Sequence, residues 1–325
     1  MSKIEIIAEA GINHNGNLKK AKKLIDIAKK ADADYVKFQL FNPYKIVNRE
    51  IQNKKINYKK IYNRFKSLQF SFEKWRTIIS YAKKKKIKIF FSIFDIDSYN
   101  QLKKFKINIV KIPSGEINNF PLLEEINKNK PRVILSTGMS TIDDIHKAIK
   151  KLNKCKIQLL HCVSEYPSKK HNLLIIKKFK KIFKKEIGFS DHSIETLTPS
   201  LAVMMGAKII EKHFTYNKNQ KFGDHKMSLN PNQLKEMVEQ IRFAEKSIGE
   251  EKKKISQKEK QLQNIARKGV YLNKNMIKGE RIKLKDLSFL RPAHGIQANQ
   301  YNQIINKRLK INIKKNTTLN FRMFK

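Results

Sequence analysis

Cysteine is nearly absent from this sequence, in which only Cys155 and Cys162 occur among 325 residues. Their spacing is not that of a zinc site, and two cysteines are too few for a disulfide scaffold. No apolar run approaches the length of about 18 residues that a transmembrane helix needs. The amino terminus also lacks the apolar stretch and the cleavage site of a signal peptide. From these absences we expect a protein of a reducing, cytoplasmic compartment with no membrane partner.

Acidic residues are scarce as well: 28 Asp and Glu face 71 Lys and Arg, which gives a formal net charge of +43. Only ten of the basic residues are arginine, the residue that recognises bases and phosphates through two parallel hydrogen bonds. The lysines are spread over every expected helix, so the composition does not predict a specific nucleic-acid reader. A protein that binds polyanions through its charge alone is one alternative, and such a field should also draw anionic substrates towards any cleft.

Short apolar segments, expected as strands, alternate with amphipathic segments, expected as helices, through residues 1–250. Eight such strands are the count of a (β/α)8 TIM barrel. The competing fold, a doubly wound open sheet, normally has a glycine-rich turn after its first strand, and residues 9–16 do not match that pattern. We therefore predict a parallel barrel with strands at residues 4–8, 35–38, 89–92, 109–112, 133–136, 157–160, 187–189 and 209–211.

Three other segments differ from this alternation. Residues 42–67 are polar and weakly periodic, so we expect a long loop over the mouth of the barrel. Residues 251–264 are charged and predict a linker with a helical turn. Residues 265–325 consist of short strand-like and turn-like pieces, which predict a small, β-rich second domain.

Polar side chains follow most of the expected strands, and in a parallel barrel they converge on one rim, where this architecture carries out its chemistry. His192 and His213 end the seventh and eighth strands, and two imidazoles completed by water and substrate suit a divalent transition metal. Lys37 and Lys111 end the second and fourth strands, and they suit an anionic group such as phosphate. The further candidates on this rim are Glu9, Gln39, Ser114, Glu116, Ser136, Ser164, Tyr166 and Ser190.

Each candidate also has a structural interpretation. The lysines can be ordinary solvated residues, Glu9 and Glu116 can serve only to pair with them, and the serines can be helix N-caps, which loops between strand and helix need in any case. A lone histidine is usually satisfied by its surroundings, but two in matching positions favour function. His161 and Cys162 are expected to pack in the core, and His225 stays open between a metal ligand, a substrate contact and a loop residue.

Seven motifs follow one another along nearly the whole chain, at residues 8–16, 36–39, 111–116, 136–139, 188–192, 211–215 and 291–296. They read AEAGINHNG, VKFQ, KIPSGE, STGM, GFSDH, EKHFT and RPAHGI. Together they resemble the sialic acid (N-acetylneuraminate) synthases, a family that includes the legionaminic and pseudaminic acid synthases. The resemblance implies a TIM barrel followed by an antifreeze-like (SAF) domain. It also implies a domain-swapped homodimer in which each small domain caps the barrel of the partner subunit.

The activity implied by this resemblance is the condensation of phosphoenolpyruvate with an open-chain N-acyl mannosamine-type sugar. The products are phosphate and a nine-carbon 2-keto acid, and the implied cofactor is Mn²⁺ or Mg²⁺ held by His192 and His213. Glu116 is implied as the acid/base group that handles the water, with Glu9 and Lys111 as further catalytic candidates. The implied phosphoenolpyruvate contacts are Lys37, Lys111, Ser136, Ser164 and Ser190. The implied sugar contacts are Glu9, Gln39, Tyr166, Asp224 and, from the partner subunit's small domain, the residue at the position of Arg291.

Some motifs depart from the N-acetylneuraminate branch of that family. Phe38, Pro113 and residues 164–166 look closer to the legionaminate branch, and residues 222–225 read FGDH where the family usually reads GPDH. The alternative is therefore an N,N'-diacetyllegionaminate or pseudaminate synthase that uses a 6-deoxy 2,4-diacetamido sugar. An alternative of a different class is a Schiff-base aldolase that uses Lys111 and pyruvate.

Overall fold

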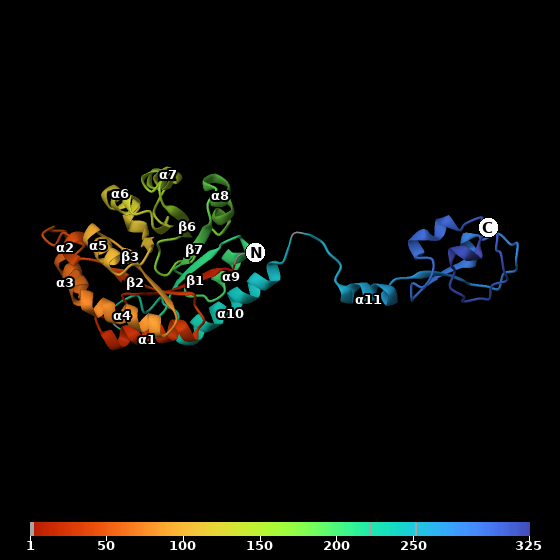
Figure 1. Cartoon of the computed structure of the whole chain (residues 1–325), viewed down its shortest axis with the longest axis horizontal. Helices are drawn as coiled ribbons and strands as arrows, with labels where there is room; N and C mark the ends of the chain where they lie inside the picture. The colour runs from red at the N-terminus through yellow and green to blue at the C-terminus, as the bar shows by residue number, and fades with distance from the viewer. Residues whose placement is uncertain (1–2, 221–222, 251) are drawn as a thin grey trace. The chain divides into compact units, whose positions relative to one another are not determined.

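The computed structural model describes residues 3–220, 223–250 and 252–325, and the chain divides into two compact units, Met1–Gly249 and Glu250–Lys325. In the first unit, eight parallel strands pair in chain order, and β8 pairs with β1, so the barrel is closed (Figure 1). This closure confirms the predicted TIM barrel and excludes the open sheet. The strands are β1 Glu5–Gly11, β2 Tyr35–Leu40, β3 Lys88–Ile93, β4 Ile109–Ile112, β5 Arg132–Ser136, β6 Lys156–Cys162, β7 Ile187–Asp191 and β8 Ile209–His213.

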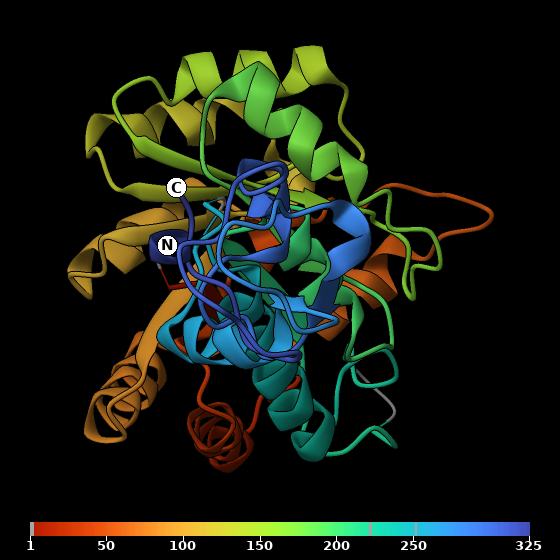
Figure 2. The same ribbon diagram turned by 90° about the vertical axis from the view of Figure 1, so that its right-hand side faces the viewer.

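Helices lie around the outside of these strands (Figure 2). Those between consecutive strands or after the last one are α1 Leu18–Lys30, α2 Pro43–Ile46, α3 Tyr58–Leu68, α4 Phe72–Lys84, α5 Ile96–Lys104, α6 Phe120–Lys128, α7 Ile142–Lys151, α8 Leu174–Phe183, α9 Thr198–Met204 and α10 Pro231–Ile248. A short 3₁₀ helix, η1 Ser114–Glu116, follows β4.

Helix α1 shows how one helix of this protein can contribute to the core and still contain many lysines. It begins where the Asn17 side chain accepts a hydrogen bond from the backbone N–H of Lys20, which satisfies one of the free donors of the first turn. Its buried residues are spaced by three and four positions and form one apolar face, while its lysines cover the solvated face. The buried residues are Ala21, Leu24, Ile25 and Ala28.

The prediction of a long loop over residues 42–67 was wrong for a large part of that segment. Helix α2 occupies Pro43–Ile46, and α3 occupies Tyr58–Leu68. Helix α3 is capped by Asn57 and buries Tyr62 and Leu68. Its apolar residues recur every three or four positions, but lysine and asparagine between them hide the pattern.

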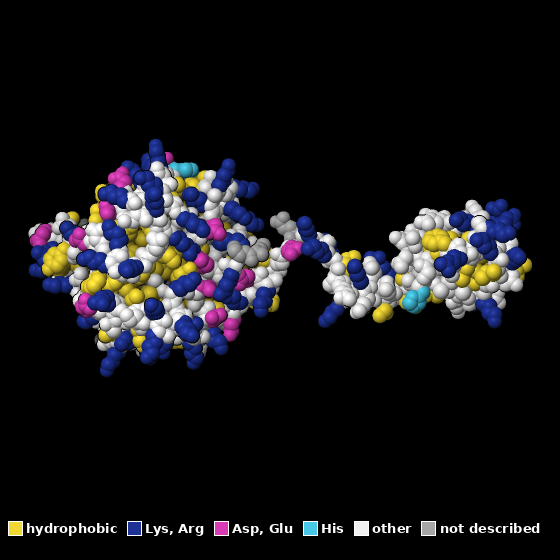
Figure 3. All heavy atoms as spheres, in the orientation of Figure 1, with side chains coloured by type: hydrophobic (Ala, Val, Ile, Leu, Met, Phe, Trp, Pro, Cys, Tyr) yellow, Lys and Arg dark blue, Asp and Glu magenta, His cyan; other side chains and the backbone are white. Residues whose placement is uncertain are grey.

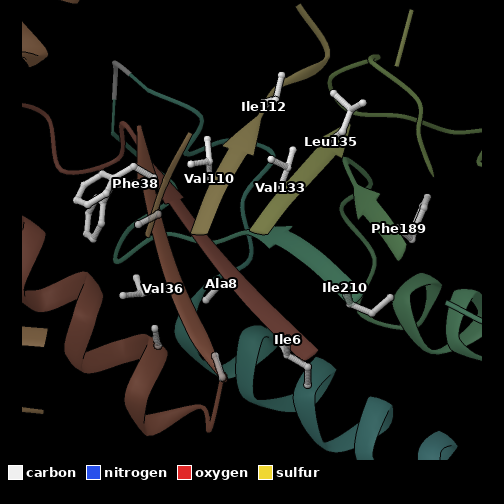
Figure 4. Packing of buried hydrophobic residues seen from close by; sticks show 14 of the residues in the cluster. Ile6, Ala8, Val36, Phe38, Val110, Ile112, Val133, Leu135, Phe189 and Ile210 are labelled. Carbon is white, nitrogen blue, oxygen red and sulfur yellow. The ribbon is translucent and has the colours of Figure 1, made fainter. Parts of the chain in front are cut away.

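The barrel strands place alternate side chains outside and inside. On the outside, apolar residues pack under the helices; Figure 4 shows them on the strands. On the inside, a separate apolar layer fills the middle of the barrel with Ile7, Tyr35, Phe90, Ile134, Leu160 and Ile209. Residues two positions further along the same strands form the next inward layer, and these are the polar residues Glu9, Lys37, Ser92, Ser136, Cys162 and Glu211.

Gly188 marks how tightly the middle layer is filled. It faces the barrel interior on β7, and a Cβ atom at this position would lie 2.5 Å from the carbonyl oxygen of Ile209 and 2.5 Å from a methyl carbon of Leu160. No side chain can occupy that space without shifting the backbone of β8. The layer therefore closes the floor below the polar residues.

The second unit contains a longer helix and fewer strands than the sequence suggests. Helix α11 covers Gln257–Ala266, so the second half of the expected linker is helical. Strands β9 Gly269–Leu272 and β10 Leu287–Leu290 form an antiparallel pair. The rest consists of turns, isolated bridges and the 3₁₀ helices η2 Leu284–Asp286, η3 Ala298–Gln303 and η4 Phe321–Met323 around a small apolar core.

The surface of the molecule is rich in lysine throughout. On the face shown in Figure 3, Lys and Arg side chains are scattered over both units and do not gather in a single patch. Within residues 3–220, 223–250 and 252–325, none of the helices has both the length and the apolar character required to cross a bilayer.

Candidate active site

A cavity of about 200 Å³ opens at the carboxyl end of the barrel strands. It is lined mainly by polar side chains that follow the apolar layer or lie on the loops after the strands. Most of the candidates from the sequence are brought together here. The lining residues among them are Glu9, Lys37, Gln39, Lys111, Ser114, Ser136, Ser164, Tyr166, Ser190, His192 and His213.

Two buried ion pairs share Lys37 on the floor of the cavity. Its Nζ atom lies 2.7 Å from Oε2 of Glu9 and 3.4 Å from Oε2 of Glu211. It also donates a hydrogen bond of 2.6 Å to Oγ of Ser92. The Lys37 side chain is only 3% exposed. Its charge is therefore stabilised by these partners, and by a ligand in the cavity, rather than by water.

Lys111 is buried on the opposite side of Glu211. Its Nζ donates 2.5 Å to Oγ of Ser136 and 3.2 Å to the carbonyl oxygen of Ile112, and it lies 3.9 Å from Oε1 of Glu211. The same Oε1 accepts a 2.9 Å hydrogen bond from Ser190. Glu211 thus lies between the two lysines and forms an ion pair with each of them.

The protonation of these four groups follows from burial and from their mutual distances. Burial raises the pKa of Glu9 to about 7, against the pull of Lys37. Burial also opposes ionisation of Glu211, but Lys111 and Lys37 together lower the pKa of Glu211 to about 2. Burial lowers the pKa of Lys111, whereas the two carboxylates outweigh burial and raise the pKa of Lys37. With Glu9 partly protonated near neutral pH, less negative charge faces the two lysines, and the cluster suits an anionic ligand.

The two histidines predicted as metal ligands stand side by side on the cavity wall, with ring centres 5.9 Å apart. His192 is oriented by its Nδ1, which donates 2.8 Å to the carbonyl oxygen of Val163. Its Nε2 is therefore the unprotonated nitrogen, and it accepts a 3.2 Å hydrogen bond from the hydroxyl of Tyr166. Nδ1 of His213 is buried without a hydrogen-bond partner, 3.8 Å from Oδ2 of Asp224.

These imidazoles fit a divalent metal. Burial lowers the pKa of His192 to about 4 and also lowers the pKa of His213, so both are neutral at pH 7, the form that binds metals. The carbonyl that orients His192 is the kind of outer partner that metal-binding histidines have. Within the described chain, no group of three or more His, Cys, Asp or Glu side chains is arranged as a metal site. His192 and His213 are the imidazoles of this cavity that could hold such a metal.

A third wall of the cavity is built around Gly138. Its N–H donates 3.0 Å to Oγ of Ser114, which lies 3.2 Å from Sγ of Cys162. A Cβ atom at position 138 would come within 2.2 Å of Oγ of Ser164 and 2.8 Å of Sγ of Cys162. Only glycine permits these hydroxyls to approach the backbone so closely. Cys162, expected to pack in the core, is buried and also lines the cavity.

Three further lining residues follow the same rule of alternation, and two of them, Ser92 and Cys162, were not expected at the rim. Ser92, Cys162 and Glu211 each lie two positions beyond an apolar residue of the inner layer. The spacing of two positions along each strand is the sequence signal that identifies these residues. The other lining residues missed by the sequence interpretation are Phe94, Pro113, Gly115 and Met139.

Glu116 is not brought to the cavity wall. It lies at the end of the 3₁₀ helix η1 and is not among the residues that line the cavity, and its Oε2 accepts a 2.7 Å hydrogen bond from Asn119. Burial and the nearby Asp95 raise the pKa of Glu116 despite that hydrogen bond. Its acid/base role stays a prediction from the resemblance.

Two further predicted residues do not line the cavity, and a third position is not described. Asp224 lies beside His213 but lines an adjoining cavity. Arg291 belongs to the second unit, where it is exposed. In the segment 222–225, Phe222 lies outside the described residues.

His225, which the sequence left open, is fully buried as a structural residue. Its Nδ1 lies 2.5 Å from Oγ1 of Thr215, and its Nε2 lies 3.2 Å from Oδ1 of Asn15. It holds the loop after β8 against the loop after β1.

Comparison with known proteins decides the family. Residues 24–253 match the NeuB family. The chain belongs to this family. Residues 267–325 match the SAF domain, as the resemblance implied. The chain is 39% identical to the N,N'-diacetyllegionaminic acid synthase of Campylobacter jejuni over 94% of this chain and 96% of that protein. It is 32% identical to the pseudaminic acid synthase of Helicobacter pylori over 97% of this chain and 96% of that protein.

The fold is shared with a solved structure of the same family. An N-acetylneuraminic acid (sialic acid) synthetase from Leptospira borgpetersenii, crystallised with citrate, superposes with a TM-score of 0.74. It is 34% identical, and the superposition covers 80% of this chain and 90% of that protein. NeuB-family relatives thus include synthases of three related products, and membership alone does not choose among them.

Proposed function

We propose that this chain is a nonulosonic acid synthase, an enzyme that condenses phosphoenolpyruvate with an N-acyl mannosamine-type sugar to give a sialic acid or close analogue and phosphate. The observation that carries the proposal is the buried pair Lys37 and Lys111 on the floor of a cavity whose wall bears two neutral imidazoles. Family membership supports the same reaction class.

Phosphoenolpyruvate carries a carboxylate and a phosphate, and the floor of the cavity suits both. Two buried cations face one firmly ionised carboxylate, Glu211, and a second one, Glu9, whose pKa is raised to about 7. Hydroxyls of Ser136 and Ser190 stand beside these charges. An ammonium group that is already desolvated loses little further hydration when it meets an anion.

The reaction forms one carbon–carbon bond and, from water, one carbon–oxygen bond, and it breaks the carbon–oxygen bond to phosphate. C3 of phosphoenolpyruvate attacks the aldehyde carbon of the sugar, water adds at C2, and the tetrahedral intermediate expels phosphate to leave the 2-keto acid. The lysines hold the departing phosphate and neutralise its charge. Glu9 is placed to hold or release a proton at this floor, because its pKa lies near 7.

A divalent metal, Mn²⁺ or Mg²⁺, is part of this proposal, with His192 and His213 as its protein ligands. When bound it supplies Lewis-acid polarisation of the aldehyde. The hydrogen bond from His192 to Val163 fixes the nitrogen that faces the cavity. We expect His213→Ala to lose metal affinity, as measured by calorimetric titration with Mn²⁺, whereas His146→Ala on the exposed face of α7 should bind as the wild type does.

The sugar is proposed to lie along Gln39, Tyr166 and Asp224, next to the two imidazoles. The proposed acceptor is an N-acyl mannosamine. The alternative is a 6-deoxy 2,4-diacetamido sugar, which the 39% identity to a legionaminic acid synthase supports. We also place the enzyme in a reducing, cytoplasmic compartment, since both cysteines are free.

A domain-swapped homodimer completes the proposed site. The exposed Arg291 of the SAF domain would contact the N-acyl group of sugar bound in the partner barrel. Arg291→Ala should then raise KM for the sugar by about tenfold, the value of one charged hydrogen bond, and leave KM for phosphoenolpyruvate within twofold. Lys268→Ala in the same unit is the control. Equal damage to both KM values would refute the assignment of Arg291.

The direct test of the proposed reaction is to identify its product. Purified protein is incubated with phosphoenolpyruvate, Mn²⁺ and either N-acetylmannosamine or the 6-deoxy 2,4-diacetamido sugar, and the mixture is examined by mass spectrometry. A nine-carbon 2-keto acid formed in step with free phosphate is the expected result. Phosphoenolpyruvate that stays intact with every sugar would remove the proposal.

A Schiff-base aldolase is the second candidate, favoured by one observation. Burial lowers the pKa of Lys111, and a neutral amine is what imine formation requires. Borohydride reduction in the presence of pyruvate would then attach three carbons to Lys111, detectable by peptide mass. The synthase proposal expects no such adduct.

A further inference from the structure

A buried ion pair joins the two strands that end in the proposed metal ligands. On the outer face of the barrel, β7 and β8 pack Phe189 and Ile210 under the helices (Figure 4). Asp191 and Lys212 lie two positions further along that face. Nζ of Lys212 lies 2.6 Å from Oδ2 of Asp191, and both side chains are fully buried. A charged pair thus continues a layer that is apolar below it.

The hydrogen bonds around this pair satisfy both charges. Besides Asp191, the Lys212 ammonium group donates to the carbonyl oxygen of Ser193 at 2.6 Å and to its hydroxyl oxygen at 3.0 Å. Asp191 in turn accepts 2.8 Å from the backbone N–H of Ser193 and 2.9 Å from its hydroxyl. Three acceptors therefore meet the three protons of the ammonium group. The pair is complete without water or a ligand, so it is not itself a binding site.

The pair lies directly behind the two imidazoles. Asp191 and Lys212 face each other in the last pair of the ladder between β7 and β8, and His192 and His213 are the next residues along the chain. Because the ammonium group also contacts Ser193, it holds the residues on both sides of His192. It extends from the residue just before His213. One side chain therefore fixes the separation of the two strand ends from which the imidazoles project.

The two imidazoles depend on this support to different degrees. The ring of His192 is held by its hydrogen bond to Val163, and its backbone carbonyl accepts 3.0 Å from the N–H of Ser168. Nδ1 of His213 has no hydrogen-bond partner among the described residues, so the backbone of β8 places this ring. A shift of β8 against β7 would therefore move His213 relative to His192.

Stability alone does not explain why an ion pair is fully buried here. Taking two charges out of water is costly, and well-packed apolar residues of similar volume are often as stable or more stable at such positions. What the pair supplies is a fixed geometry between two strand ends. Metal ligands need such a geometry, because their distances must lie within about 0.2 Å of the preferred values.

We propose that Lys212 and Asp191 are positioning residues for the metal site: their buried ion pair sets the separation of His192 and His213 that a divalent cation requires. This inference rests on the metal of the proposed function and adds the groups that support its ligands. Because the two charges cancel, replacing both should lower metal affinity through geometry, with little change in the local charge.

The test measures Mn²⁺ affinity by calorimetric titration of the full chain, at a temperature well below the melting temperature of every variant. Asp191→Asn/Lys212→Met removes both charges and leaves neither one buried without its partner. We expect its Kd for Mn²⁺ to rise about 10- to 100-fold, the usual effect of losing an outer partner of a metal ligand. The control is Ile126→Ala, in the buried face of α6, which should melt earlier but keep Kd within about twofold of wild type.

Ser193→Ala removes only the shared hydroxyl and serves if the double variant does not fold. It should raise Kd by about tenfold. An unchanged Kd in whichever of these variants folds overturns the positioning role while leaving the metal site intact. An equal rise in Ile126→Ala also overturns it, since affinity would then follow general stability. Absence of Mn²⁺ binding by the wild-type chain contradicts the metal of the proposed function itself, and the positioning role with it.

Discussion

The two ends of the barrel both contain charged clusters, yet they are built differently. At the amino end, the guanidinium of Arg132 pairs with both carboxylate oxygens of Glu5 and donates 2.6 Å to Gln158, which in turn donates to Glu186. At the carboxyl end, two lysines and two glutamates are buried, beside an imidazole nitrogen with no partner. In the first cluster, the charged groups are paired with one another. In the second cluster, the buried lysines and the imidazole nitrogen can still interact with a ligand.

The choice of cation explains much of this contrast. The planar guanidinium of arginine binds one carboxylate through two parallel hydrogen bonds, and this pairing uses most of its donors. The ammonium group of lysine is a compact point charge that can contact several anions. The Arg132 and Glu5 side chains are 20% and 30% exposed, while Lys37 and Lys111 are each 3% exposed. The same strand, β1, provides Glu5 to the closed cluster and Glu9 to the open one. An end of a barrel thus becomes a site when its charges are buried and left incompletely paired.

The largest expected difference between the two ends is in activity. Lys111→Met removes one cation from the cavity floor, while Lys37 and Ser190 continue to satisfy Glu211, so the fold should persist. We expect kcat/KM to fall about 10²–10³-fold, the usual cost of losing a preorganised charge at the reacting group. Phosphate release at fixed sugar measures it. If kcat/KM fell by less than tenfold in a variant that melts as the wild type does, the two ends of the barrel would not differ in the way proposed.

Acid should weaken the carboxyl end first. Burial lowers the pKa of His14 to about 3 and those of His192 and His225 to about 4, and all three lie on loops or strand ends at this rim. Between about pH 6.5 and 4 the unfolded chain binds more protons than the native one, so stability falls as pH falls through that window, by up to about 1.4 kcal/mol per pH unit for each group.

Hydrogen exchange at pH 7 and pH 5 separates the two ends. Amides of the loops that contain His14, His192 and His225 should exchange faster at the lower pH, while those next to Arg132 in β5 keep their protection. His14→Phe, which fits among Phe70 and Trp75, should reduce the acid sensitivity. Uniform acceleration along every strand would contradict a weakness confined to the rim.

The smallest effect on activity is expected at the amino end. Arg132→Met breaks the pair with Glu5, which is partly solvated, so the free energy of unfolding should fall by only about 1 kcal/mol. Denaturant unfolding measures that loss, and kcat/KM should stay within twofold of wild type. A large fall in activity with little loss of stability would show that the amino end takes part in the reaction.

The sequence predicted the barrel well because its signals are local. Each inner strand is a short apolar run, and the polar residue two positions further on marks the rim, as with Ile7 and Glu9 or Ile209 and Glu211. Helix α3 escaped prediction because lysine and asparagine dilute its apolar face. Pairing could not be predicted from the sequence, because no local pattern shows that Glu211 bridges two lysines contributed by β2 and β4, or that Glu116 pairs with Asn119 outside the cavity lining.

The central claim is that the lysine floor and the imidazole wall act together on two substrates and a metal. The most direct measurement is phosphate release from phosphoenolpyruvate with each component omitted in turn, repeated after full chelation. The account predicts release only when phosphoenolpyruvate, an N-acyl mannosamine-type sugar and Mn²⁺ or Mg²⁺ are all present, and near-complete loss in His213→Ala. Release that survives chelation, or that proceeds without sugar, would contradict it.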